Sequence, residues 1–99
     1  MTVISRLSSS VGRKDQEPNL ELARELRDTR NEKAIAELVE NLSGDNKAIQ
    51  HDCIKVLYSI GYDDAGLVSK YVSEFLHLLR LKDNHMVWGA MIALSTIAT

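Results

Sequence analysis

Apolar residues follow a helical spacing along most of this chain, and the spacing nearly repeats after 37 positions. When residues 35–61 are shifted onto residues 72–98, apolar residues fall on apolar residues without a gap, as for Leu38 with Phe75 and Leu57 with Leu94. A period between about 20 and 50 residues is typical of stacked units that bury their apolar faces against one another. The pattern therefore predicts an all-α fold, a solenoid of antiparallel helix pairs.

Five main helices are predicted after residue 18. Each carries apolar residues at the i, i+3, i+4 and i+7 positions, and residues typical of turns separate one helix from the next. The predicted ranges are about 19–29, 31–42, 47–60, 67–81 and 85 to near the C-terminus. Asp45 or Asn46 is expected to cap the third helix, and Gly61 is expected to break it.

The first eighteen residues differ from the rest of the chain. Val3, Ile4 and Leu7 fall at helical spacing among serines and arginines, which favours an N-terminal arm or short capping helix over the alternative, an organelle transit peptide. A polar linker follows and ends near Pro18, which suits the first turn of a helix. The predicted organisation is an arm over residues 1–18 and a helical repeat domain over residues 19–99, with a half-repeat at 19–30 and repeats at 31–61 and 66–98.

Composition changes this interpretation little. The formal net charge of the 99 residues is −2, with 26% charged residues, and carboxylates lie between the arginines of residues 24–30, so a nucleic-acid partner is not favoured. Charges interrupt every apolar stretch before the ~20 residues that span a bilayer, so no membrane segment is expected. A single cysteine indicates a reducing compartment, and a cytoplasmic location is predicted.

Catalytic and cofactor motifs are not found in the sequence. It contains no Gly-rich phosphate loop, HExxH motif, nucleophile elbow or CxxC pair. Successive residues of a helix point about 100° apart, so His51, Asp52 and Cys53 cannot converge on one atom. Cys53 also falls where the repeat requires a small buried residue, which makes an inert thiol the expectation.

Metal binding is not expected either. His77 and His85 flank a predicted turn that contains Asp83, so a two-histidine site is geometrically conceivable. Two histidine ligands without a third make a poor zinc site, and solvated surface histidines are the favoured interpretation. The sequence therefore predicts no catalytic, cofactor or metal site.

The two helix pairs resemble HEAT repeats over about residues 31–98. The family's second helix follows a turn that contains Asp and carries small residues, Leu and Ile at set positions; the matching residues here are Asp83, Met86, Ala90, Met91, Ala93, Leu94 and Ile97, and in the preceding unit Ile49, Cys53, Ile54, Val56, Leu57 and Ile60. Gln50 and Val87 stand where the family has Arg, so the usual ladder of Asp and Arg between repeats is not expected. Armadillo-like and other helical hairpin stacks remain alternatives.

The last predicted helix is apolar on nearly every side. Val87, Trp88, Met91 and Ile92 add apolar surface to a helix whose inward face is already complete, and no polar capping repeat follows it. A longer repeat array, a second copy or a different protein would each cover this surface. The candidate partner-binding residues are those on the exposed sides of the third and fifth helices: Gln50, His51, Lys55, Val87, Trp88, Met91 and Ile92.

These observations predict a non-catalytic protein–protein interaction or assembly scaffold that contacts a partner protein or self-associates through its C-terminal helix. The alternative is a piece of a HEAT-like enzyme whose site lies in repeats outside this sequence, because the resemblance also extends to alkylpurine DNA glycosylases and phycobilin lyases.

Overall fold

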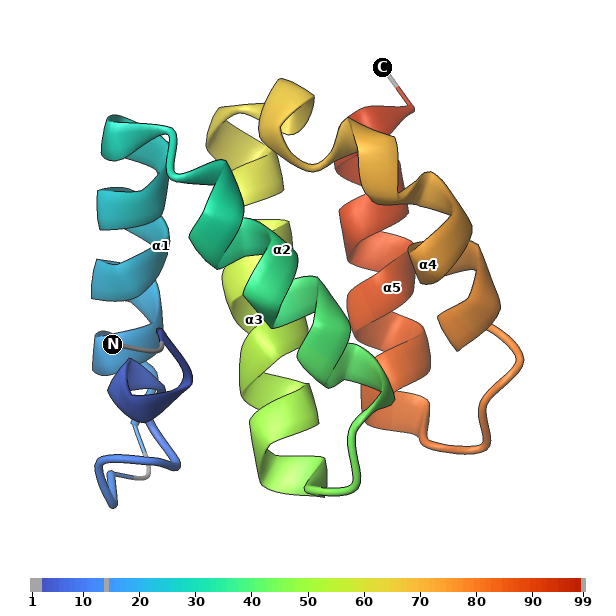
Figure 1. Cartoon of the computed structure of the whole chain (residues 1–99). Helices are drawn as coiled ribbons and strands as arrows, with labels where there is room; N and C mark the ends of the chain where they lie inside the picture. The colour runs from blue at the N-terminus through green and yellow to red at the C-terminus, as the bar shows by residue number, and fades with distance from the viewer. Residues whose placement is uncertain (1–2, 14, 99) are drawn as a thin grey trace.

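The computed structural model describes residues 3–13 and 15–98, and within these residues five α-helices form two layers (Figure 1). Helices α1, α3 and α5 lie side by side, while α2 and α4 cover them on one side. The described residues form no strand, so the predicted all-α class and its five main helices are confirmed. The bounds are α1 Glu17–Thr29, α2 Glu32–Glu40, α3 Lys47–Asp63, α4 Val72–Leu78 and α5 Asn84–Ile97.

Short polar side chains set the starts of three helices. Asn31 accepts a hydrogen bond from the backbone N–H of Ala34, and Asn46 accepts one from Ile49, each at 3.1 Å. The carboxylate of Asp83 accepts from two backbone N–H groups at the start of α5. Such caps satisfy amide groups that have no partner inside the helix. The predicted cap at residue 46 is therefore confirmed.

The predicted break at Gly61 is wrong. Helix α3 continues through this residue to Asp63, and Gly61 is buried against α5. A Cβ atom at this position would overlap Oγ1 of Thr96. Glycine thus permits close helix packing here, although Gly weakens a helix by about 0.5–1 kcal/mol relative to Ala.

The fourth helix is shorter than predicted. Only Val72–Leu78 is α-helical, and two 3₁₀ helices, Ala65–Leu67 and Ser69–Tyr71, precede it. The turn after α4 also has hydrogen bonds between residues three apart, for example from the N–H of Leu81 to the carbonyl of Leu78. The apolar spacing is compatible with both helix types, so the sequence pattern did not separate them.

The N-terminal arm forms a 3₁₀ helix, Val3–Arg6, and a following turn that are both attached to the helices. Leu7 is fully buried, and the backbone N–H groups of Ser8 and Ser9 donate to side chains of α1 and α3. Arg6 forms an ion pair with Glu25 of α1, which lowers the pKa of that carboxyl group. Residues 1, 2 and 14 of the predicted arm, and residue 99 of the predicted repeat domain, lie outside the described residues.

The core lies between the two layers. Its fully buried side chains come from every α-helix and from the arm, and the largest of them are Leu7, Leu22, Leu26, Ile35, Leu38, Ile54, Leu57, Ile60, Phe75 and Met86. Among the described residues, no helix combines the length and the apolar character that a membrane span requires.

Candidate functional site

A groove of about 450 Å³ runs across α3 and α5 and is closed at one side by the N-terminal arm. Two helix stripes form its floor, because residues three, four and seven apart share one side of a helix. Its main contributors are His51, Lys55 and Tyr58 from α3, His85, Trp88 and Ile92 from α5, and Ser9 and Arg13 from the arm. Cavities of a few hundred Å³ are of the size that binds small ligands or a few residues of a peptide.

Trp88 is the large apolar side chain of this groove that is most open to solvent, with 65% of its surface exposed. The next residue, Gly89, is buried, and a Cβ atom there would lie 2.6 Å from Cγ1 of Ile54. The absence of that atom lets α5 approach α3 closely. Trp88 is thereby held over α3, at the edge of the groove.

A pair of stacked imidazole rings forms one end of the groove. The ring centroids of His51 and His85 lie 4.2 Å apart with an angle of 11° between the planes. Nε2 of His51 lies 2.8 Å from Oδ2 of Asp83, and this hydrogen bond lowers the pKa of the Asp83 carboxyl group. Because Asp83 also caps α5, the contact joins the two helix pairs.

This contact joins the helix pairs where the usual ladder of Asp and Arg was not expected. Gln50, at the position where the resemblance to HEAT repeats would place Arg, donates its side-chain amide to the carbonyls of Leu42 and Gly44 in its own helix pair. His51, one residue further on, reaches Asp83 of the next pair. His51 and Asp83 therefore form a polar link between the two helix pairs, with His51 rather than an arginine as the contacting residue.

The candidate residues predicted from the sequence divide into separate groups. His51, Lys55, Trp88 and Ile92 line the groove together. The other three do not line it: Gln50, in the first turn of α3, directs its side chain to carbonyls of the preceding segment, while Val87 and Met91 lie elsewhere on the surface of α5.

A buried polar network beside the groove was not predicted from the sequence. Asp52 accepts hydrogen bonds from the N–H of Ser9 and from Nδ2 of Asn19, both at 2.9 Å. The Oδ1 atom of Asn19 accepts from the N–H of Ser8. The network fixes the arm to α1 and α3 and so determines one wall of the groove. Its only sequence signal is two polar residues at inward helix positions, which gives no indication that they contact each other.

The described residues contain no group of three or more His, Cys, Asp or Glu side chains placed to hold a metal ion. His77, considered with His85 as a two-histidine site, lines a different cavity, between α2 and α4, whereas His85 stacks on His51.

Cys53 is fully buried in the core, and its burial raises the pKa of the thiol to about 12, with smaller contributions from the charges of Asp52 and Glu37. Because the thiolate is the reactive form, we expect the folded chain to react with a disulfide reagent at pH 8 at least about a hundredfold more slowly than the unfolded chain. Absorbance of the released thiolate measures both rates. Equal rates in the presence and absence of denaturant would contradict the burial of this side chain.

No protein-family model matches this chain, and no curated protein or solved structure shows significant similarity to it.

Proposed function

We propose that this chain is a non-catalytic protein–protein interaction or assembly module built from HEAT-like repeats, and that a partner polypeptide binds in the groove across α3 and α5. The observation that carries the proposal is the exposed indole of Trp88 beside a groove lined by aromatic, apolar and cationic side chains. Tryptophan is enriched among the residues that contribute most to binding at protein interfaces.

Two features of the groove support a polypeptide as the occupant. The groove is open along two parallel stripes of helix surface, and its polar groups are dispersed along it, from Arg13 and Lys55 to the His51–His85 stack. An extended peptide presents hydrogen-bonding groups and side chains at regular intervals and matches such a distribution. We propose a cytoplasmic location for the module, in keeping with its single free cysteine.

Peptides selected by display on the folded chain would test this proposal. Trp88 is the only tryptophan, so a peptide that occupies the groove should change the fluorescence of the wild-type chain. We expect Trp88→Ala to weaken the binding of selected, labelled peptides at least about tenfold, measured by fluorescence anisotropy, because truncation of an interface tryptophan typically costs more than 1–2 kcal/mol.

Met91→Ala is the matched control, since Met91 is an exposed apolar residue of the same helix that does not line the groove. It should leave the affinity unchanged. Peptides whose binding is insensitive to both Trp88→Ala and Lys55→Ala would contradict the proposal, as would a selection that yields no specific peptide.

A further inference from the structure

Two carboxylates lie at the groove, and every oxygen atom of both already accepts a hydrogen bond. Oδ1 of Asp52 accepts from Nδ2 of Asn19 and Oδ2 from the backbone N–H of Ser9, and only 7% of Asp52 is exposed. Asp83, beside the histidine stack, contacts His51 through Oδ2 and accepts from the first N–H groups of α5 through Oδ1. These two side chains therefore leave little acceptor capacity for a bound partner.

Lys55, in contrast, is a hydrogen-bond donor of the groove that has no carboxylate partner. Its ammonium group lies 5.0 Å from the ring centroid of Tyr58, and within the described part of the chain it forms no ion pair. The partly buried side chain is held in place by this cation–π contact. The indole N–H of the exposed Trp88 is a further donor on the same surface. The groove thus offers donors, whereas its charged acceptors are in use.

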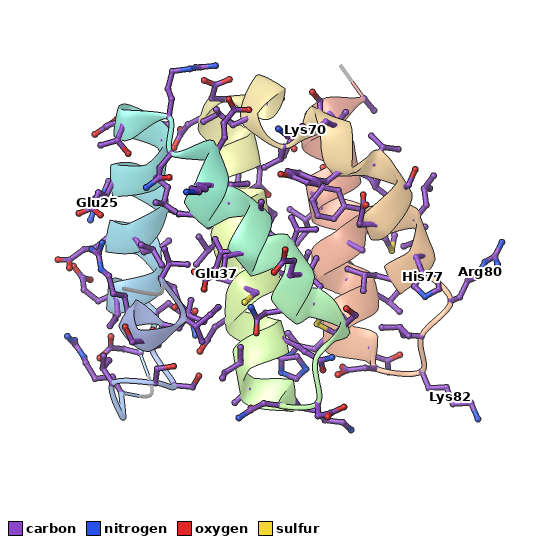
Figure 2. All side chains as sticks on the ribbon, viewed as in Figure 1. Glu25, Glu37, Lys70, His77, Arg80 and Lys82 are labelled. Atoms are coloured by element: carbon purple, nitrogen blue, oxygen red, sulfur yellow. The ribbon has the colours of Figure 1, made fainter. Side chains whose placement is uncertain are left out.

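Other basic side chains are paired or lie elsewhere. Arg13 lines the groove, but its guanidinium group forms an ion pair with Asp15 at 2.9 Å. Arg80 and Lys82 extend from the segment after α4 and do not line the groove (Figure 2). Among the described lysines and arginines that line the groove, Lys55 is therefore the one left to receive an anion from a partner.

The helix starts near the groove are already capped. Helices α3 and α5 both begin at the end where His51 and His85 stack (Figure 1). Asn46 accepts from the N–H of Ile49 at the start of α3, and Asp83 caps α5. Phosphate groups bind well where free N–H groups of a helix start or several cations converge. Here the caps occupy those N–H groups and one cation is unpaired, so a singly charged carboxylate is the better match.

The apolar side chains of the groove lie further along both helices. Tyr58 follows Lys55 by three residues in α3, and Ile92 follows Trp88 by four residues in α5. The stripe from His51 to Tyr58 rises by about 10 Å, at 1.5 Å per residue. About three residues of extended chain cover this length. A short segment can therefore bring one side chain to Lys55 and an apolar side chain to the aromatic part of the groove.

We infer that the partner segment bound in the groove is acidic, with an Asp or Glu carboxylate that pairs with Lys55 and an adjacent apolar residue that packs on Trp88 and Tyr58. The inference rests on the proposed function of the groove and specifies the chemistry of its partner. A carboxylate supplies the acceptors that the groove lacks and forms a charge-assisted hydrogen bond with the ammonium group. A basic segment would instead meet Lys55 as a like charge.

Peptides selected by display on the folded chain, and weakened by Trp88→Ala, provide the test. We expect them to contain Asp or Glu next to an apolar residue. Replacing that acidic residue with Asn or Gln should weaken binding at least about tenfold at neutral pH and low ionic strength, measured by fluorescence anisotropy. Lys55→Glu should cause a loss at least as large, and it should instead favour the same peptide with Lys at the acidic position.

Lys33→Glu is the matched control, because it makes the same change of charge at an exposed residue of α2 that does not line the groove. It should leave the affinity unchanged. Circular dichroism confirms that each variant is folded, and Lys55→Gln provides a second variant if Lys55→Glu does not fold.

Four outcomes separate the inference from the proposed function. Groove-binding peptides without acidic residues, or acidic peptides whose affinity does not depend on Lys55, would overturn the inference and leave the groove as a partner site. A selection without any peptide sensitive to Trp88→Ala would contradict the proposed function, and the inference with it. A single-stranded oligonucleotide that displaces the peptides, and that both Lys55→Glu and Trp88→Ala weaken, would overturn the acidic polypeptide in favour of nucleic acid.

Discussion

Leu57→Ala is expected to lower the free energy of unfolding by about 2–5 kcal/mol, the range for removing a fully buried leucine side chain. Leu57 has no exposed surface and lies on α3, the helix that contacts both neighbours in its layer. The missing methyl groups leave a cavity that the surrounding helices cannot fully close. Urea denaturation followed by circular dichroism measures the loss.

Leu94→Ala is the matched comparison, because Leu94 is the residue that the 37-residue repeat places in the equivalent position. Leu94 is only partly buried, so its truncation should cost clearly less than that of Leu57. Equal losses of unfolding free energy for the two substitutions, measured on a monomeric sample, would contradict the difference in burial between Leu57 and Leu94.

Gly89→Val is expected to destabilise the fold by about 2–3 kcal/mol, through overpacking between α3 and α5. The first added atom would lie 2.6 Å from Cγ1 and 2.8 Å from Cγ2 of Ile54. Both atoms belong to a β-branched side chain that has little rotamer freedom in a helix, so the backbones themselves must separate. Thermal unfolding followed by circular dichroism measures the effect.

Two further variants distinguish this mechanism from a general effect of valine. Gly44→Val should have little effect, since a Cβ atom there meets only the carbonyl oxygen of Asn41, at 3.4 Å, and the backbone φ of −77° suits any residue. Combining Gly89→Val with Ile54→Ala should cost less than the sum of the two single losses, because the truncated residue leaves room for the new one. Additive losses would exclude a direct contact between residues 54 and 89.

The candidate site shows that sequence periodicity predicts which side chains are exposed better than it predicts which exposed side chains share a surface. The spacing identified Trp88 and Met91 as surplus apolar residues of the last helix, and both are exposed. It placed them on one partner surface, whereas Trp88 lines the groove and Met91 does not. Three residues correspond to about 300° of rotation, so the two side chains point to sides about 60° apart, and the neighbouring helices decide which surface each one joins.

The polar contacts were less accessible to sequence reasoning. Nothing in the pattern indicated that His51 would contact Asp83, 32 residues away. The same holds for Asp52 and Asn19, which are 33 residues apart and share a buried hydrogen bond. Partner choice over such distances depends on helix crossing geometry, which the local spacing does not encode.

The sequence by itself determined the helical class, the five main helices, most of their inward residues and the repeat between them, because the burial of an apolar stripe every 3.6 residues is a local requirement. The 3₁₀ turns around α4, the close approach at Gly61 and Gly89, the histidine stack and the choice of which exposed residues line the groove were decided only by tertiary structure. Each of these features arises where helices distant in the sequence meet, and their separation and angle follow from all the side chains between them.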